Sequence, residues 1–319
     1  MVAGLILTLA GAGGTPGDVG RASAPAAADT VTLTDDLDRR VSLPAPARRI
    51  VSLVPAATEI LFALGAGDRV VGRTRYGVHP EAARGVQSVG EGMRPSTELV
   101  AARDPDLVIL YAGEANRSTV RELERLELRT LAMEHDTFGD LYRAIERLGT
   151  VTGRSEPAAR LSERIRCEIA AVGSAVAGAP RPRVYYDVWG DPPITVGRDS
   201  YLDSLVSVAG GENVFGDLPG PSPRVSLEAI VSRAPDVVVW PRTGSSAEGS
   251  RPGDRAGWGS LDAVAAGEVR SVDGDLLHRL GPRIGEAARE LAAALHPERS
   301  DLVRRAGDGC GLEHAEPGT

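Results

Sequence analysis

Two stretches of the chain are near copies of each other: STELVAARDPDLVILY (residues 96–111) and SLEAIVSRAPDVVVWP (residues 226–241). They align without a gap, so that a serine, a glutamate, an arginine and a Pro-Asp pair recur at matching positions. Each copy opens with a serine that can cap a helix, carries an acid in the first turn, and breaks at the Pro-Asp pair before an apolar run. Such a run is typical of a parallel strand buried on both faces. The repeat therefore predicts an α/β fold of two similar, Rossmann-like lobes.

The segments ahead of the first copy follow the same alternation of strands and helices. Residues 49–72 (RIVSLVPAATEILFALGAGDRVVG) begin with a short apolar strand, which Pro55 ends, and continue with a helix and a second strand. This order is typical of parallel strand pairing. Before it, residues 30–48 predict an exposed hairpin around Asp35 and Asp36.

A single long helix is expected between the lobes. In residues 155–178, apolar residues recur at helical spacing, which predicts a helix of roughly twenty residues and about 30 Å. The chain then divides into a leader, an N-terminal lobe, the linking helix, a C-terminal lobe and a disordered tail, at residues 1–28, 29–154, 155–180, 181–297 and 298–319.

Composition excludes some classes of function. The formal net charge of −8 argues against a non-specific nucleic-acid binder, and the basic residues are all arginine. The two cysteines, Cys167 and Cys310, lie in different contexts without metal-like spacing, so no disulfide framework is expected. Cys167 is expected to be a small buried or half-buried helix residue, and Cys310 an exposed residue of the tail.

The N-terminal segment predicts an exported protein. Residues 2–12 (VAGLILTLAGA) form an apolar run too short to span a bilayer, and a Gly, Pro and Ala-rich stretch follows. This order matches a secretory signal with small residues near the cleavage point, although the basic start is missing. No cysteine follows that would support a lipid anchor. The alternative is a disordered Ala/Gly leader.

The sequence lacks the common catalytic motifs. It contains no G-x-S-x-G nucleophile elbow and, without lysine, no phosphate loop ending in Gly-Lys. A glycine-rich dinucleotide fingerprint is absent after the first strand, where Val54 and Pro55 stand instead. We therefore expect a protein that is not an enzyme and carries no resident cofactor.

Several of these segments together resemble a known family. Residues 49–72, PDLVILY, YLDSLVSVAGGENVFGD and PSPRVSLEAIVSRAPDVVV are similar to the substrate-binding proteins of ABC importers, in the class joined by one long helix (class III). That class handles cobalamin, haem and iron–siderophores, and the resemblance covers roughly residues 47–297. The stretches VGRTRYGVHPEA, YAGEANR and GDLPGPSPRVS resemble the cobalamin-binding branch most closely.

The resemblance gives the repeat a role. In these proteins each lobe presents an acid to an arginine cluster on one half of a two-fold symmetric permease, and Glu98 and Glu228 match those positions. A carboxylate at a helix N-terminus is exposed and can accept paired arginine bonds. The alternative is that each glutamate only complements its helix dipole.

The resemblance also implies a ligand site between the lobes, at the carboxyl ends of the strands. Aromatic rings suit a corrin or porphyrin plane, while a carboxylate or guanidinium can bond its side chains. The matching residues are Tyr76 and Tyr111 from the first lobe, and Trp189, Ser222, Asp275 and Arg279 from the second. The alternatives are a core position for Tyr111 and inter-lobe packing for Trp189.

The chain departs from the cobalamin branch where that branch carries further tryptophans, since Gly92, Ser222 and Leu276 stand at those positions. The five histidines do not show the spacing of a metal site, although His278 near a haem iron stays an alternative.

We expect an exported, monomeric, periplasmic or extracytoplasmic protein that captures cobalamin or a related corrinoid with only a small closure of the lobes. Its partners would be this ligand and an ABC permease with its ATPase, with no nucleic acid and no metal. The alternatives are a haem or iron–siderophore binding protein, and an envelope sensor or interaction protein that keeps the fold.

Overall fold

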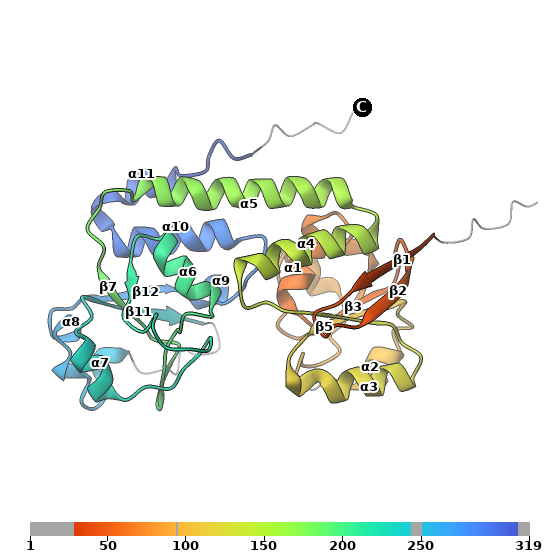
Figure 1. Cartoon of the computed structure of the whole chain (residues 1–319), viewed down its shortest axis with the longest axis horizontal. Coiled ribbons are helices and arrows are strands. Elements are labelled where there is room, and N and C mark those ends of the chain that lie inside the picture. The colour runs from red at the N-terminus through yellow and green to blue at the C-terminus, as the bar shows by residue number, and fades with distance from the viewer. Residues whose placement is uncertain (1–28, 94, 244–250, 312–319) are drawn as a thin grey trace, which may run out of the picture.

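The computed structural model describes residues 29–93, 95–243 and 251–311, so the expected leader lies outside the described residues. Two four-stranded parallel sheets lie side by side beneath one long helix (Figure 1). The first sheet has the order β4-β3-β5-β6, from β3 (Ile50–Ser52), β4 (Val70–Arg73), β5 (Leu107–Tyr111) and β6 (Thr130–Met133). The second has the order β10-β7-β11-β12, from β7 (Arg183–Tyr186), β10 (Glu212–Asn213), β11 (Val237–Arg242) and β12 (Val269–Asp273).

The two sheets share one topology. In each, the strand that comes first along the chain lies between the second and the third, and every pairing is parallel. The strand order therefore reverses beside β3 in one lobe and beside β7 in the other. Ligands of open α/β sheets bind outside the carboxyl ends of the strands at such points. The predicted α/β fold of two similar lobes is confirmed.

The repeated sequence is a repeated structure. Its helices are α2 (Thr97–Ala101) and α7 (Leu227–Arg233). Ser96 and Ser226 cap them, each accepting a 3.2 Å hydrogen bond from the backbone N–H three residues on. Both copies then turn through a non-glycine residue with positive φ, 48° at Asp104 and 43° at Ala234.

An arginine fastens each copy to its sheet. The Arg49 guanidinium donates to the Asp104 carbonyl at 2.7 Å, and that of Arg183 donates to the Arg233 carbonyl at 2.7 Å. Both arginines lie at the start of the first strand of their lobe. They satisfy carbonyls that a helix end leaves without partners, so helix, turn and strand form one unit in each lobe.

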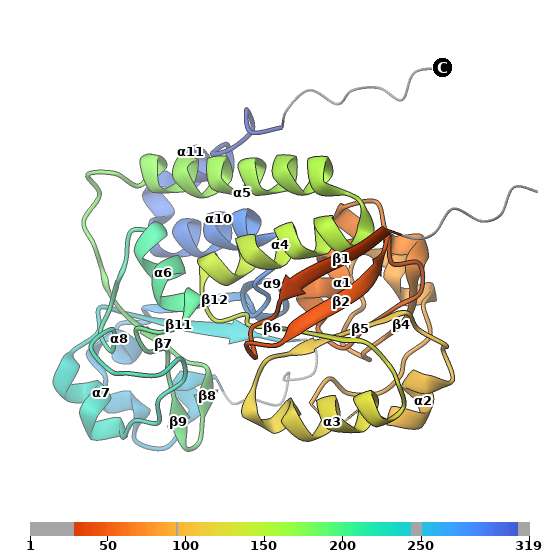
Figure 2. The ribbon, with the colours of Figure 1, turned by 45° about the vertical axis from the view of Figure 1, so that its right-hand side comes forward.

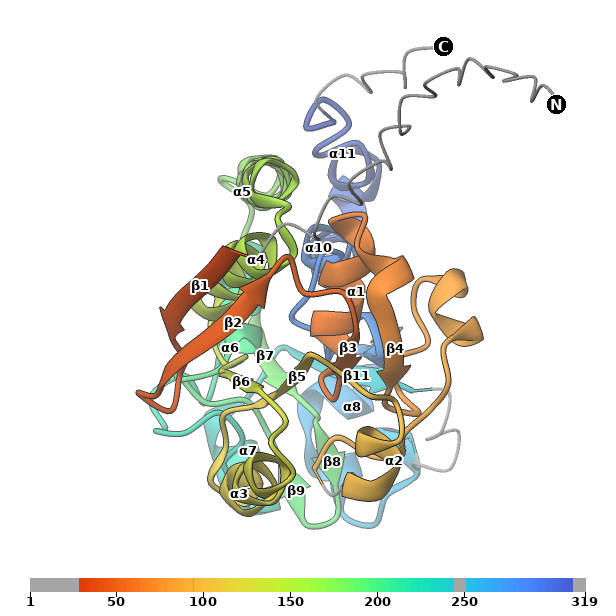
Figure 3. The same ribbon diagram turned by 90° about the vertical axis from the view of Figure 1, so that its right-hand side faces the viewer.

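The linking helix is α5 (Ser155–Ala175). It covers α4 (Phe138–Thr152) and α10 (Ile284–Leu295), which lie beneath it (Figure 3). One hydrophobic cluster runs through both lobes and includes buried residues from α1 (Pro55–Ala63), α4, α5, α6 (Tyr201–Val208) and α10, among them Ile60, Leu148, Ile165, Leu205 and Leu291. The lobes are therefore joined by a shared apolar core as well as by the chain.

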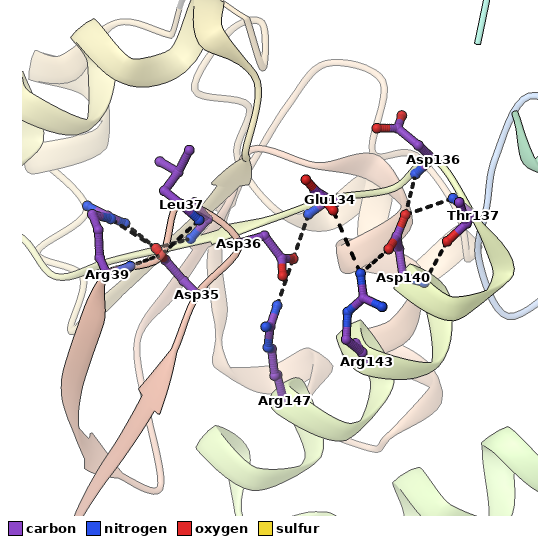
Figure 4. A network of polar contacts seen from close by, with 11 residues as sticks. Asp35, Asp36, Leu37, Arg39, Glu134, Asp136, Thr137, Asp140, Arg143 and Arg147 are labelled. Carbon is purple, nitrogen blue, oxygen red and sulfur yellow. Dashed lines mark hydrogen bonds and ion pairs between the residues drawn. The ribbon is translucent and has the colours of Figure 1, made fainter. Parts of the chain in front are cut away.

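The N-terminal hairpin forms as expected, with β1 (Asp29–Thr34) antiparallel to β2 (Arg40–Ala45). Its turn is anchored to the first lobe by the polar network of Figure 4. The buried Asp35 carboxylate accepts from the Arg39 backbone N–H and Nε, both at 3.0 Å. Asp36 pairs with Arg147 of α4 at 2.7 Å and accepts from the Glu134 N–H at 2.8 Å. The hairpin is therefore packed at its turn and is not merely an exposed appendage.

The C-terminal segment corrects two expectations. Residues 298–311 are not a disordered tail, because α11 (Ser300–Arg304) packs against the molecule with Val303 fully buried; residues 312–319 lie outside the described residues. Cys310 is 6% exposed and forms a disulfide with Cys167 of α5. The expectation of no disulfide and an exposed Cys310 is wrong, because the returning chain brings together two cysteines 143 residues apart.

The remaining elements are short and lie around the sheets. They are α3 (Arg117–Arg125), α8 (Asp262–Ala265), α9 (Gly274–Leu277), and the hairpin of β8 (Trp189–Gly190) and β9 (Pro193–Ile194). Within the described part of the chain, no helix is both long enough and apolar enough to cross a bilayer.

Candidate functional site

Each predicted ligand residue except Ser222 lies on or just after the carboxyl end of a strand. Tyr76 follows β4, Tyr111 ends β5, Trp189 lies just beyond β7, and Asp275 and Arg279 follow β12. Because the sheets are parallel, these positions gather at one end of each sheet.

Tyr76 and Arg279 meet across the two lobes. Arg279 Nη1 donates to the Tyr76 carbonyl at 2.7 Å, while the Tyr76 side chain stays 47% exposed. The neighbouring Arg75 contacts the Tyr76 hydroxyl at 2.5 Å and lies 4.8 Å from the ring centroid. The Tyr76 ring is thus presented to solvent beside an inter-lobe contact. One nitrogen of the Arg279 guanidinium already has a hydrogen-bond partner within the protein.

A buried carboxylate that sequence reasoning missed lies behind this contact. Glu59 of α1 accepts from Arg283 Nη2 at 2.9 Å and Nε at 3.0 Å, and its side chain is 2% exposed. Arg279 Nη1 lies 3.8 Å from the same carboxylate. The sequence contained one signal for Glu59, because a glutamate among the apolar residues of a buried helix requires a charged or hydrogen-bonding partner.

Tyr111 is a half-buried ring whose hydroxyl has a partner. It donates to the Asp136 carboxylate at 3.0 Å, and its ring stacks on His135 with centroids 6.5 Å apart. Burial first, and then the Asp136 charge, raise the pKa of Tyr111 to about 12. Burial lowers the pKa of His135 to about 4, and neither ring nitrogen has a hydrogen-bond partner in the described structure. Tyr111 can therefore present a ring edge, with its polar tip engaged by the protein.

The Asp136 backbone makes a second inter-lobe contact. Its carbonyl accepts from the Tyr201 N–H of α6 at 2.6 Å. The Tyr201 hydroxyl in turn donates to the Leu277 carbonyl at 3.0 Å. The β6–α4 loop of the first lobe is thereby tied to the second lobe.

Trp189 lies on the β8–β9 hairpin with its side chain 59% exposed, which does not fit inter-lobe packing. Its indole Nε1 donates to the Asp191 carbonyl at 2.9 Å. Ser222 is exposed on a neighbouring loop, which pairs with the hairpin through the bridge between Ile194 and Arg224. Trp189 and Ser222 therefore belong to one hydrogen-bonded surface of the second lobe. Asp275 is exposed on α9.

A second buried ion pair supports the chain that leads into this hairpin. Asp187 follows β7 and pairs with Arg255 at 2.7 Å, with side chains 1% and 13% exposed. Burial raises the pKa of Asp187, although the Arg255 charge opposes this. The Arg255 guanidinium also lies 4.7 Å from the centroid of the buried Trp258 ring. Sequence reasoning missed both residues, which are 68 positions apart and share no local pattern.

A hollow that sequence reasoning also missed lies at the edge of the second sheet. It has a volume of about 400 Å³ and is lined by Trp240, Arg242, Arg251, Val269 and Ser271. Trp240 ends an apolar run, a position in sequence that is typical of core residues. The described residues hold no grouping of three or more histidines, cysteines or acids that could bind a metal ion.

Glu98 and Glu228 occupy equivalent exposed places. Each is the second residue of its helix, on α2 and α7 respectively. The pKa of each carboxyl is lowered by a hydrogen bond from its own backbone N–H and then by the capping serine. Figures 1 and 2 show α2 and α7 on the side of the molecule opposite α5, and Figure 2 shows the β8–β9 hairpin on the same side. Both acids are therefore ionised, and their helices lie on one side of the molecule.

Comparison with known proteins matches this architecture. The family model described as "Periplasmic binding protein" matches residues 50–276. An uncharacterized ABC transporter substrate-binding lipoprotein, YvrC of Bacillus subtilis, is 30% identical over 84% of this chain and 86% of its own length. A cobalamin-binding protein of Halobacterium salinarum is 32% identical over 83% of this chain and 74% of its own.

A solved structure agrees. The periplasmic vitamin B12 binding protein BtuF of Vibrio cholerae is 26% identical, with a TM-score of 0.68 over 82% of this chain and 99% of its own. The topology of both lobes, the linking helix and the match across residues 50–276 lead to one conclusion. The chain belongs to the periplasmic binding protein family, as a class III substrate-binding protein of ABC transporters.

Proposed function

We propose that this protein is exported, captures cobalamin or a related corrinoid between its lobes, and delivers it to an ABC permease with its ATPase. The observation that carries the proposal is the duplicated, serine-capped helix with an exposed, ionised glutamate in each lobe, Glu98 and Glu228. A two-fold symmetric partner needs the same charged feature twice, and arginine is the side chain that best recognises a carboxylate.

The exposed aromatic residues support a large planar ligand. Tyr76 of the first lobe and Trp189 of the second expose 47% and 59% of their surface, on loops at the carboxyl ends of the sheets. Their exposure leaves a ring on each lobe able to stack on a flat ligand. Cobalamin is preferred over haem and ferric siderophores because relatives that match 77% and 83% of this chain carry the names vitamin B12-binding protein and cobalamin-binding protein.

Export is supported by the disulfide. Bonds such as that between Cys167 and Cys310 form and persist in oxidising compartments, and cytosolic proteins rarely keep them. The protein would then act outside the cytoplasm as a monomer without catalytic chemistry.

Titration of the purified protein tests the ligand. Cyanocobalamin, haemin and a ferric hydroxamate siderophore are titrated in parallel by calorimetry, with the haem absorption band followed for haemin. Sub-micromolar cobalamin binding without a haemin response is the expected result. Haemin or siderophore binding without cobalamin binding would move the protein to the iron branch. Binding of none of the three would overturn the proposed function.

A further inference from the structure

A buried cluster of charges joins the two lobes at the α1 helix. The Glu59 carboxylate of the first lobe receives both bonds of the Arg283 fork, at 2.9 and 3.0 Å, from the residue just ahead of α10. The Glu59 side chain is 2% exposed, and those of Arg279 and Arg283 are 15% and 26% exposed. The pair therefore lies largely out of water, where charge interactions are strong and an unpaired charge is costly.

The same carboxylate also orients the second arginine. Arg279 Nη1 lies 3.8 Å from Glu59 Oε1 and donates to the Tyr76 carbonyl at 2.7 Å. Arg279 and Arg283, four residues apart, thus converge on one acid of the opposite lobe. His79, three residues beyond Tyr76, faces this cluster, and burial and then the Arg283 charge lower its pKa.

An ion pair at position 59 has to be explained, because an apolar residue could also occupy this place. The buried residues around Glu59 on α1 are mostly apolar, including Ala56, Ile60 and Leu61, although the adjacent Thr58 is also buried. An apolar residue could fill such a site at little or no loss of stability, because desolvation of the charges offsets most of their attraction. A paired fork adds geometric specificity to the contact, because both bonds must align at once. The gain from Glu59 is therefore expected in geometry more than in stability.

We propose that Glu59 is a positioning residue that ties the two lobes at a fixed separation before any ligand arrives, and that it holds Arg279 against the Tyr76 loop. The claim that Glu59 fixes the separation of the lobes rests only on the contacts described above. The part that concerns ligand affinity rests on the proposed function, since it takes Tyr76 and Arg279 as ligand residues.

Lobe spacing is measured by pulsed electron resonance between spin labels at Glu122 of α3 and Ser232 of α7, with the native disulfide intact. Both residues are exposed, and both helices lie far from α5, where a change in lobe angle moves them most. The unliganded protein should show one narrow distance distribution, and Glu59→Gln should broaden it. The matched control is Glu156→Gln, which removes the exposed Glu156–Arg160 pair of α5 and should leave the distribution unchanged. A narrow, unshifted distribution in Glu59→Gln would overturn the tie.

A double-mutant cycle tests action through Arg279. Glu59→Gln should weaken binding of the ligand found by titration at least about tenfold, the scale of a lost charge-assisted hydrogen bond. In an Arg279→Met background the same change should add little, because its effect passes through Arg279. If the losses of affinity from Glu59→Gln and Arg279→Met are fully additive, Glu59 does not act through Arg279.

Failure of ligand binding and failure of the Glu59→Gln variant to fold have different consequences for the proposal. If the wild-type protein binds none of the three ligands, the proposed function fails, and the distance measurement still decides the tie. If Glu59→Gln does not fold, Arg283→Lys replaces it, since lysine keeps the charge and loses the fork. That variant should broaden the distances, and an unchanged distribution would again overturn the proposal.

Discussion

Tyr76 and Trp189 are large rings that the fold leaves in solvent, one on each lobe. Each has one fixed contact: the Tyr76 backbone carbonyl accepts from Arg279, and the Trp189 indole itself donates to the Asp191 carbonyl. An exposed ring on a fixed backbone loses little freedom when a flat ligand covers it. At the scale of single residues, the candidate site is therefore organised before binding.

Removal of either ring should weaken binding of the ligand. Tyr76→Ala and Trp189→Ala are each expected to reduce affinity by about tenfold, because stacking and burial of an aromatic face are lost. Calorimetry gives the affinity. Tyr142→Ala serves as the control, since that ring lies on α4 under the Arg166 guanidinium, 4.1 Å away. If the control loses as much affinity as the site variants, the assignment of the rings is wrong.

His135 should make stability depend on pH. Its folded pKa is lowered by burial to about 4 from an ordinary 6.5, so the unfolded chain binds more protons between these values. Stability is then full above pH 6.5 and falls as the pH drops toward 4, by about 2 kcal/mol between pH 7 and 5. Urea unfolding at both pH values measures this. His135→Phe keeps the stack on Tyr111, and its free energy of unfolding should fall by about 2 kcal/mol less than that of the wild type between pH 7 and 5. Equal losses in the two proteins would show that His135 is not the source of the pH dependence.

At the scale of elements, the repeat is a rigid module used twice. A capping serine, an acid, a left-handed turn residue and an arginine from the first strand recur in both lobes. The left-handed turn residue and the arginine are enough to end each helix, and the acid is not needed for that. Among the described residues, the contacts that fasten the modules do not use Glu98 or Glu228, and the proposed docking onto a symmetric partner would account for their repetition.

Reversal of both charges should separate docking from binding. Glu98→Arg with Glu228→Arg is expected to abolish ligand delivery to the permease while affinity stays within about twofold, because the site residues are untouched. Uptake assays and calorimetry measure the two quantities. The control, Glu156→Arg with Glu163→Arg, makes the same change in charge on α5. Normal uptake by the Glu98/Glu228 variant would remove the docking assignment.

The disulfide joins two elements that are otherwise distant in the chain. Replacement of Cys167 and Cys310 by serine should lower the free energy of unfolding by about 2 to 5 kcal/mol, since the bond closes a long loop of the unfolded chain. Denaturant unfolding measures the difference. A reductant should destabilise the wild-type protein and leave the serine variant unaffected. Equal stability of both proteins would show that the bond does not form in solution.

At the scale of the whole molecule, several contacts hold the lobes in one arrangement. The apolar core is continuous through α1, α4, α5, α6 and α10. The Glu59–Arg283 pair and the Asp136–Tyr201 backbone bond add polar links between the lobes. Hinge motion on ligand binding would have to break these contacts.

Ligand binding should therefore change the shape of the protein very little. Small-angle scattering of unliganded and ligand-saturated protein is expected to differ in radius of gyration by less than about 1 Å, as in pre-organised complexes. Glu59→Gln should be slightly more expanded without ligand. A large compaction of the wild-type protein on binding would contradict a fixed lobe separation.

The repeated units could be predicted from the amino-acid order, because each depends on neighbours within one helical turn or one strand. The serine caps, the acids in the first turn and the Pro-Asp break all act between residues a few positions apart. A long helical period of apolar residues likewise predicts the linking helix. For these reasons the α/β class, the two lobes, the hairpin and the places of Glu98 and Glu228 could be predicted.

Contacts between residues far apart in the chain depend on the folded arrangement of both lobes. Glu59 and Arg283 lie 224 positions apart, and Cys167 and Cys310 lie 143 apart. Arg279 was predicted to face a ligand, yet it also contacts Tyr76 and Glu59. Such pairings carry no local pattern, because they follow from how the last helices return over the first lobe and the linking helix. The inter-lobe tie and the anchored C-terminal segment therefore became visible only when both lobes were seen together.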